Sequence, residues 1–331
     1  MAKDGEITGK PGMNTMFDVL ALGELLIDFT CVGQDETGYP TMAAHPGGAP
    51  ANFLAALARM GMKTALLGKV GDDVFGHLLI GTLRDAKICT DGIITDGDAF
   101  TTLAFVTLDG TRNREFSFAR KPGADTRMTK QEIRTDMIDR CKVFHFGTLS
   151  LTDEPAREAT RFAVSYAKSH GKLITFDPNL RKSLWKDLDE AKKQISWGLS
   201  QADIVKISDE EVAFLWGLSP EEGAGKLLQD APVQLALVTC GADGCVYKNR
   251  NAFGRVPAMT DIHVVDTTGA GDIFGGSAVG RILQTGKEPE NLSDAELREI
   301  VHYACTVAGL STTRAGGISS VPEMGEVAGA L

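Results

Sequence analysis

Short apolar runs alternate with longer helical patterns along most of the chain from Phe17 onward. The run FDVLALGELLIDF (17–29) predicts a first strand, and KTALLGKV (63–70) predicts the next one. Between them, APANFLAALARMG (49–61) predicts a helix, because Pro50 stands in its first turn, apolar residues recur at spacings of three and four, and Gly61 closes it.

The same alternation continues toward the C-terminus. A helix is expected from Val74 to Ala86, and two more over 154–169 and 186–199. The apolar runs between and after them are KVFHFGTLSL (142–151), KLITFDP (172–178), DIVKIS (203–208) and LALVTCG (235–241). Strands that alternate with helices of this length predict a mostly parallel sheet with helices on both faces.

One segment departs from this rhythm. Residues 101–120, TTLAFVTLDGTRNREFSFAR, hold two alternating patterns around Asp109-Gly110, which predicts a hairpin. Leu103, Phe105, Phe116 and Phe118 would form its apolar stripe. With the turn-rich stretch 30–45 it would make a small sheet serving either as a lid over a ligand or as a plain edge hairpin.

The simplest organisation is one domain with a lid. Residues 1–16 are polar, lack an apolar core of a signal peptide and are expected to be a disordered tail. The single domain would span 17–331, with a core of 17–29, 46–100 and 121–325 and a lid of about 30–45 and 101–120.

A glycine-rich turn carries the strongest chemical signal. After the apolar run IHVVD (262–266), interpreted as a strand, come Thr267, Thr268 and Gly-Ala-Gly-Asp (269–272), and then an amphipathic helix. Glycines let backbone N–H groups converge, and a helix N-terminus favours negative charge, so the turn is suited to a phosphate. A carboxylate there, Asp272, would repel a phosphate at rest, but it makes sense as a base for an attacking hydroxyl. The simpler alternative is an Asp that only caps the helix.

Two familiar nucleotide motifs do not fit. Glycines at 269, 271 and 275 give G-x-G-x-x-x-G rather than the dinucleotide fingerprint, and the sequence holds no P-loop motif.

Composition narrows the partners. The net charge is −10, which argues against a nucleic-acid partner, and no apolar run is long enough to cross a membrane. Six cysteines are scattered without a C-x-x-C pair, as expected for buried thiols in a reducing compartment. A cytoplasmic protein is therefore expected.

A second polar cluster is expected where strands end. HPGGAPANF (45–53) is a glycine-rich turn that opens a helix with Asn52 in its first turn, and Asp28 ends the first predicted strand. Ligands gather at the carboxyl ends of parallel strands, and Asp28, Gly48 and Asn52 would suit sugar hydroxyls there. Each alone is also a common cap or turn residue.

Together, HPGGAPANFLAALARMGMKTALLGKVGDDVFG (45–76) and VVDTTGAGDIFGGSA (264–278) resemble the two signatures of the PfkB, or ribokinase-like, carbohydrate kinases. The resemblance covers about residues 17–322, and GELLIDF, GGAPAN, REFSFARKPGAD and DPNLRKSLW are most similar to the fructokinase branch. It implies a ribokinase-like three-layer α/β/α sandwich with a mostly parallel central sheet and a small β-sheet lid. It also implies transfer of phosphate from ATP to a sugar, in this branch fructose to fructose 6-phosphate.

The resemblance assigns roles to the residues that match its motifs. Asp272 is expected to be the catalytic base, with the amides of Gly269, Ala270 and Gly271 as the anion hole. Asp28, Gly48, Asn52, Phe118 and Arg120 would hold the sugar, the last two from the lid, and Arg181 would sit where sugar and phosphate meet. The expected ATP residues are Lys206, Glu211, Thr239, Gly241, Gly244, Val264, Gly269, Gly271, Cys305 and Ala308.

Two cations are also implied. Glu211 would help to organise Mg²⁺, although Ser208 stands where many members of the family have Asn. Asp266 and Thr268, with Gly316 and Ser320 of the loop RAGGISS, fit the place where the family often binds K⁺. Cys305 lies where many relatives carry Asn beside the adenine, which could alter nucleotide preference.

Several alternatives stay open from sequence. Within the fold, the chain could be a 2-keto-3-deoxygluconate kinase, a ribokinase or another sugar or nucleoside kinase. A non-catalytic binding or regulatory protein on the same fold is the alternative from a different class. A homodimer sealed through the lids is the expected assembly.

Overall fold

The computed structural model describes residues 16–108 and 114–331; the expected N-terminal tail and the turn at Asp109-Gly110 lie outside these residues. A nine-stranded sheet forms the centre, in the order β13-β12-β11-β10-β9-β8-β1-β4-β5. Its strands are β1 (Phe17–Leu22), β4 (Thr64–Gly71), β5 (Ile88–Asp96), β8 (Cys141–Gly147), β9 (Leu173–Asp177), β10 (Ile204–Ser208), β11 (Leu235–Thr239), β12 (Cys245–Asn249) and β13 (Phe253–Val256). Neighbouring strands are parallel except β11–β12 and β12–β13, so the prediction of a mostly parallel sheet is confirmed.

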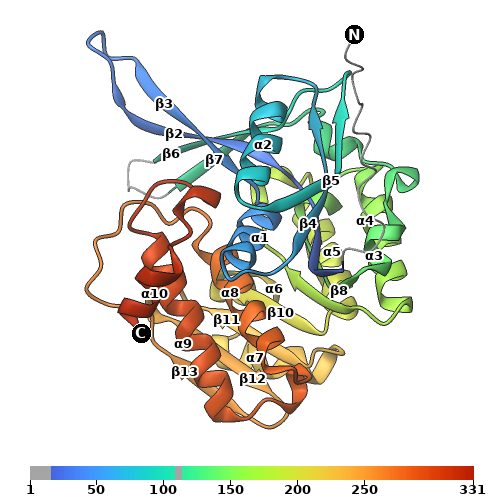
Figure 1. Cartoon of the computed structure of the whole chain (residues 1–331), viewed down its shortest axis with the longest axis vertical. Helices are drawn as coiled ribbons and strands as arrows, with labels where there is room; N and C mark the ends of the chain where they lie inside the picture. Colours follow the sequence, from blue (N-terminus) through green and yellow to red (C-terminus); the bar gives the residue numbers. More distant parts are fainter. Residues whose placement is uncertain (1–15, 109–113) are drawn as a thin grey trace, which may run out of the picture.

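Helices cover both faces of this sheet, as Figure 1 shows. On one face pack α1 (Ala49–Arg59), α2 (Val74–Asp85), α8 (Ala270–Thr285) and α9 (Asp294–Ser311), with α10 (Met324–Ala330) beside them. On the other pack α3 (Thr135–Asp139), α4 (Ala156–Ser169), α5 (Leu188–Gln201), α6 (Asp209–Trp216) and α7 (Pro220–Asp230). Each face of the sheet has its own hydrophobic core. Side chains of β1 point alternately to the two faces, so Val19 and Ala21 belong to the first core, and Leu20 and Leu22 belong to the second.

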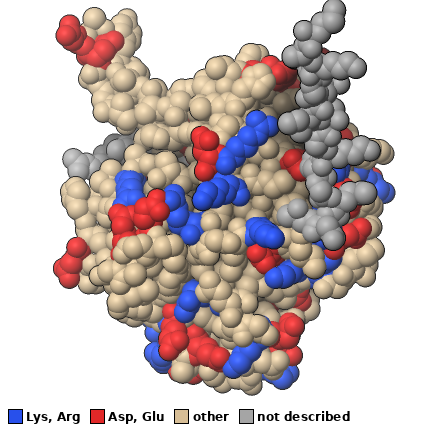
Figure 2. All heavy atoms as spheres, in the orientation of Figure 1, with Lys and Arg blue, Asp and Glu red and all other residues tan. Residues whose placement is uncertain are grey.

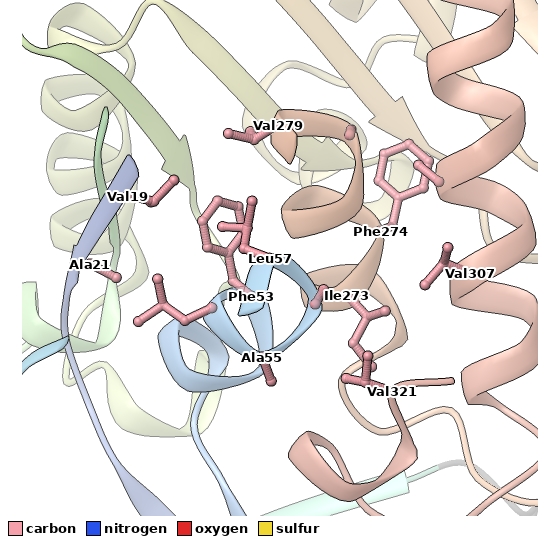
Figure 3. Close-up of a cluster of buried hydrophobic side chains, with 14 of the residues drawn as sticks. Val19, Ala21, Phe53, Ala55, Leu57, Ile273, Phe274, Val279, Val307 and Val321 are labelled. Atoms are coloured by element: carbon pink, nitrogen blue, oxygen red, sulfur yellow. The ribbon is translucent and has the colours of Figure 1, made fainter. Parts of the chain in front are cut away.

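The first core joins the two helices that carry the predicted site. In Figure 3, Phe53 and Leu57 of α1 lie between β1 and the residues Ile273 and Val279 of α8. Gly276 permits this contact, because a Cβ there would lie 2.2 Å from the carbonyl oxygen of Phe53. The N-termini of α1 and α8 therefore come side by side at one end of the sheet.

A second sheet of four strands, in the order β3-β2-β6-β7, forms the lid. Its strands are β2 (Leu26–Gln34), β3 (Pro40–Gly47), β6 (Leu103–Leu108) and β7 (Arg114–Ala119), and β2 and β3 project from the body of the molecule in Figure 1. The lid sheet thus begins before the expected boundary at residue 30. The antiparallel pairing of β6 with β7 confirms the predicted hairpin strands.

Three sequence-based expectations are wrong. Residues 17–29 are two strands rather than one, because β1 ends at Leu22 and the chain leaves the central sheet before β2. The run 262–266 is not a strand: it is irregular, and the N–H groups of Val265 and Asp266 both donate to the carbonyl of Thr312, the residue that follows α9. The predicted apolar stripe also fails, since Phe118 pairs with Ala104 and so shares its face, opposite to Leu103 and Phe105.

The two faces of the lid sheet have different tasks. Phe29 stacks on Phe105 at 5.3 Å between ring centroids and meets Phe75 of α2 edge-on, which fixes one face to the body. Asp28 pairs with Ala104 in register, and Ala104 pairs with Phe118, so Asp28 and Phe118 share the other face. That face looks onto the cavity described next.

Candidate active site

Asp272 lies at the start of α8 and is held by two side-chain amides. Nδ2 of Asn52 donates to Oδ2 of Asp272 at 2.9 Å, and Nδ2 of Asn179 donates to Oδ1 at 3.4 Å. The carboxyl group is 8% exposed. Burial raises its pKa, while Lys206, the Asn52 amide and Arg181 act in the opposite direction. The arrangement orients a carboxylate that is partly desolvated and therefore more basic than usual.

The turn before Asp272 has the geometry of an anion site. Gly269 is the N-cap residue of α8 with φ of 76°, and a Cβ there would come 3.0 Å from the Asn52 amide nitrogen, so glycine is required. The N–H of Ala270 donates to the carbonyl of Thr267 at 3.3 Å. Within the described residues, the N–H groups of Gly269 and Gly271 have no such acceptor. Of the three backbone amides expected in the anion hole, those of Gly269 and Gly271 are thus the ones without a backbone acceptor.

A small cavity opens in front of Asp272 and holds most of the predicted sugar residues. Asp28, Gly48, Asn52, Phe118, Arg181 and Asp272 all line it. Gly48 has φ of 116°, and a Cβ there would lie 2.5 Å from the carbonyl oxygen of Glu24. Glycine is thus needed where the chain turns from the lid sheet into α1.

Arg120 is the predicted sugar residue that the structure places elsewhere. Its guanidinium is buried and forms a salt bridge with Asp125 at 2.6 Å. The remaining donors go to Oγ1 of Thr152 and the carbonyl of Leu149, each at 2.8 Å. Arg120 does not line the cavity, because these partners hold its side chain in the base of the lid.

Asn179 and Glu24 line the cavity but were missed by sequence reasoning. Asn179 has φ of 43° and accepts from NH1 of Arg181 at 2.6 Å, so it links the predicted phosphate residue to the predicted base. An Asn after Asp-Pro could have signalled this turn. Leu26, Ala49 and Leu149 are further lining residues that were not predicted, and Thr268, predicted for the K⁺ site, also lines this cavity.

A buried group of charges lies beneath the turn. Lys206 donates to Oδ2 of Asp177 at 2.9 Å, and a Cβ on Gly271 would lie 3.0 Å from the Lys206 ammonium. Burial raises the pKa of Asp177 to about 7, although Lys206 lowers it. Burial alone would lower the pKa of Lys206. The negative charges of Asp177, Glu211 and Asp272 have the larger effect and raise the pKa of Lys206. Lys206, predicted to bind ATP, therefore places positive charge beneath the Gly269–Asp272 turn and does not line the larger hollow described below.

Glu211 organises the loop next to the site. Its Oε1 accepts from the N–H of Leu180 at 2.7 Å, and its Oε2 accepts from the N–H of Ser208 at 2.9 Å. Ser208 in return caps α6, so the pair forms a capping box. Among the described residues, no group of three or more His, Cys, Asp or Glu side chains could hold a metal by itself.

A larger hollow of about 330 Å³ lies on the other side of the turn. Its lining includes Ala270 and seven of the predicted nucleotide residues: Thr239, Gly241, Gly244, Val264, Gly271, Cys305 and Ala308. Met259, Ile262 and Phe274 add apolar surface that was not predicted. Burial raises the pKa of the Cys305 thiol to about 12, so it acts here as an apolar wall.

The residues predicted to bind K⁺ are brought together by Asp266. Its Oδ1 accepts from the N–H and the hydroxyl of Thr268, and its Oδ2 accepts from the N–H of Gly316 at 2.9 Å. Ser320 is fully buried, and its hydroxyl donates to the carbonyl of Gly317. Asp266 thus ties the turn before α8 to the loop at 314–320.

Charge on the surface is mixed. On the face shown in Figure 2, Lys and Arg side chains are interspersed with Asp and Glu, and the projecting end of the lid is acidic. A single-sign basic surface of the kind that binds nucleic acid is absent from this face. Within residues 16–108 and 114–331, no helix is both long and apolar enough to span a membrane.

Comparison with known proteins agrees with this geometry. Residues 16–324 match the model of the pfkB family of carbohydrate kinases. The chain is 42% identical to fructokinase-1 of Zea mays over 93% of its own length and 96% of that protein. The fructokinase of Xylella fastidiosa with bound ATP superposes with a TM-score of 0.86 and 31% identity, covering 95% of this chain and 98% of that one.

A fructokinase of Vibrio cholerae O395, solved as a double mutant with fructose, ADP and a potassium ion, gives a TM-score of 0.84 at 30% identity, covering 96% of this chain and all of that one. The family model and the plant relative each span almost the whole chain. The chain therefore belongs to the pfkB family of carbohydrate kinases.

Proposed function

We propose that this protein is an ATP-dependent fructokinase that converts D-fructose and ATP to fructose 6-phosphate and ADP. One observation carries the proposal: Asp272 stands between a polar cavity with sugar-binding chemistry and a hollow that would take a nucleotide. The plant and bacterial relatives named as fructokinases support fructose as the acceptor.

In this proposal Asp272 is the general base. The 6-hydroxyl of fructose gives its proton to the Asp272 carboxylate, and the oxygen attacks the γ-phosphorus of ATP in line. A new O–P bond forms, the bond from the γ-phosphorus to the β,γ-bridging oxygen breaks, and ADP leaves with that electron pair. The proton then passes from Asp272 to solvent or to the phosphorylated product.

The residues around the turn would stabilise the transferring phosphoryl group. The N–H groups of Gly269 and Gly271 point their partial positive charge into the site at the N-terminus of α8. Arg181, held by Asn179, would add a guanidinium from the wall of the cavity in front of Asp272. Lys206 beneath the turn offsets the negative charge of the carboxylates around it.

Mg²⁺ is expected with the nucleotide. Both oxygens of Glu211 are already used by backbone N–H groups, so this chain would hold the ion mainly through phosphate oxygens and water. When bound, Mg²⁺ neutralises phosphate charge. Glu211 keeps the loop that carries Arg181 in place.

A potassium ion beside Asp266 is a second part of the proposal. The buried Asp266 carboxylate and the carbonyl-rich loop at 314–320 support a monovalent cation there. Activity should rise when tetramethylammonium is replaced by K⁺ at constant ionic strength, and equal rates would contradict this site.

The assembly is proposed to be a homodimer joined through the lids in the cytoplasm. Val32 and Tyr39 are apolar side chains of the projecting strands, 61% and 71% exposed, and pairing of two lids would cover them. All six cysteines are free, as suits a reducing compartment. Sedimentation that gives only a 35 kDa species at micromolar concentration would contradict the dimer.

The substrate is tested by initial rates of ADP release with MgATP and a panel of acceptors. The panel holds fructose, glucose, ribose, 2-keto-3-deoxygluconate and adenosine. Fructose should give the highest kcat/KM. A preference for another acceptor would move the assignment to another branch of the family, and ATP binding without turnover of any acceptor would favour a non-catalytic binding protein.

A further inference from the structure

Glu24 is a buried carboxyl that borders the sugar cavity without a cationic partner. It follows β1, is 3% exposed, and lines the same cavity as Asp28 and Asp272. Its Oε1 accepts from the N–H of Ala49 at 2.9 Å. Within the described residues, no Lys, Arg or His lies within ion-pair distance of it.

Arg120, the cation whose charge lowers the pKa of Glu24, already has other partners. It pairs with Asp125 at 2.6 Å and gives its other donors to Thr152 and Leu149. Besides the N–H of Ala49, the donor to the Glu24 carboxyl group is the N–H of Glu24 itself, within the part of the chain that the structure describes. A carboxylate can accept more than two hydrogen bonds, and Glu24 lines a cavity that would take a polyhydroxylated ligand.

The position of Glu24 relative to Asp272 follows from α1. Glu24 is bonded to Ala49, and Asp272 is bonded to Asn52, three residues further along the same helix. Three residues of an α-helix advance by about 4.5 Å. The first turn of α1 thus holds both carboxyl groups at different points of the same cavity, so a sugar whose reacting hydroxyl meets Asp272 would offer a different hydroxyl to Glu24.

We propose that Glu24 is a sugar-binding and specificity residue, with Oε2 accepting the hydrogen of a fructose hydroxyl other than the one that is phosphorylated. The inference rests on the proposed kinase function. Glu24 would then have two roles. Its Oε1 accepts from the first N–H group of α1, and its Oε2 would bind a sugar hydroxyl.

The pKa of Glu24 gives this role a pH dependence, because the ionised carboxylate accepts a hydrogen bond from the sugar better than the protonated form does. Burial raises the pKa of Glu24 to about 7, its own N–H and that of Ala49 act to lower it, and the charges of Asp125 and Arg120 act in opposite directions. Asp28 and Asp272 are the other acids that line the cavity. The KM for fructose should therefore fall as pH rises through about 7.

The two tasks are separated by Glu24→Gln. The glutamine oxygen can still accept from Ala49, while its NH₂ replaces the acceptor that faces the sugar. A residue that only caps α1 would tolerate this change. A residue that accepts a sugar hydroxyl would not, because a hydrogen bond to a charged group is lost.

The experiment measures kcat and KM for fructose, and KM for ATP, from pH 5.5 to 8.5. For Glu24→Gln at pH 8 we expect the KM for fructose to rise about 10- to 100-fold, with kcat within about threefold and the KM for ATP within about twofold. Its KM should lose the pH dependence near 7. Asp203→Asn is the matched control, because Asp203 is a half-buried carboxyl that also accepts from a backbone N–H, that of Ile174, outside the cavity.

Monodeoxy fructoses identify the contact. One analogue should show no further loss on Glu24→Gln, because the hydroxyl that meets Glu24 is already missing. A fructose KM within twofold of wild type at every pH, in a variant that is folded and unfolds cooperatively, would overturn the proposal. If the wild type uses another sugar instead, the proposed function fails, and the same comparison with that sugar decides the role of Glu24.

Discussion

Asn52 donates a hydrogen bond to Asp272 at 2.9 Å although the two residues are 220 positions apart in the sequence. Each stands in the first turn of its helix, and the two helices are packed through Phe53 and Gly276. The contact places an amide against the proposed base and leaves the sugar cavity in front of both. The packing of α1 on α8 thus determines the geometry of the chemistry.

Asn52→Ala should shift the acid limb of the pH–activity profile. Asp272 must be ionised to act as a base, and the Asn52 amide stabilises the ionised form. Its removal should raise the pKa of Asp272 further, so the activity lost on acidification should be lost at a higher pH. We would measure kcat against pH with saturating fructose, and an acid limb at the wild-type position would contradict this role of Asn52.

Gly276→Ala should damage both stability and catalysis. The added methyl group would lie 2.2 Å from the Phe53 carbonyl and force α1 away from α8. We expect a loss of about 1–3 kcal/mol in the free energy of unfolding, together with a lower kcat. Gly225→Ala in α7 is the control, because its Cβ would meet nothing within 4 Å. Equal stability of the two variants in urea titrations would rule out the tight contact.

Much of the site could be predicted because its signals are local. The Gly269–Asp272 turn and Asn52 both stand in short glycine-rich segments that open helices. Such segments expose backbone N–H groups that can bind anions, and this property can be recognised from the sequence. The parallel sheet followed from the alternation of strand and helix patterns, which needs no knowledge of distant contacts.

The failures depend on contacts that the sequence does not display. Arg120 was assigned to the sugar, but Asp125, Thr152 and Leu149 take its donors. The predicted apolar stripe failed because the register between β6 and β7 places Phe118 on the face of Ala104, which looks onto the cavity.

The apolar run 262–266 illustrates another limit. Val264 and Val265 are 52% and 57% exposed, and Val264 lines the larger hollow, which we propose binds the nucleotide. An apolar residue that serves a ligand pocket produces the same pattern as a strand.

Lys206→Met should destabilise the fold through the carboxyl groups it leaves behind. Lys206 is bonded to Asp177, and both side chains are buried beneath the turn. Removal of one partner of a buried ion pair costs about 3–5 kcal/mol. A second change, Asp177→Asn, should recover part of this loss because it removes the uncompensated carboxyl. Urea unfolding of both variants is the measurement, and an unchanged midpoint for Lys206→Met would refute the argument.

Glu24 should make the folded state less stable as pH rises. Its pKa is about 7 in the folded protein against 4.5 for an exposed Glu, so its contribution is present below pH 4.5 and is lost as pH rises through 7. The difference of about 2.5 pKa units corresponds to about 3 kcal/mol. Glu24→Gln should therefore gain about 3 kcal/mol relative to wild type between pH 4 and pH 8. A constant difference between the two proteins across this range would show that Glu24 titrates normally.

Asp272→Asn removes the proposed base with almost no change in the shape of the side chain. Asparagine keeps the shape of the side chain and can still be held at the start of α8, but it cannot take a proton. We would measure kcat for fructose phosphorylation with saturating MgATP, alongside the exposed control Asp189→Asn and the binding of ATP to each protein. We expect a kcat lower by about 10²- to 10⁴-fold for Asp272→Asn, with ATP binding retained. A kcat within threefold of wild type would contradict the assignment of Asp272 as the base.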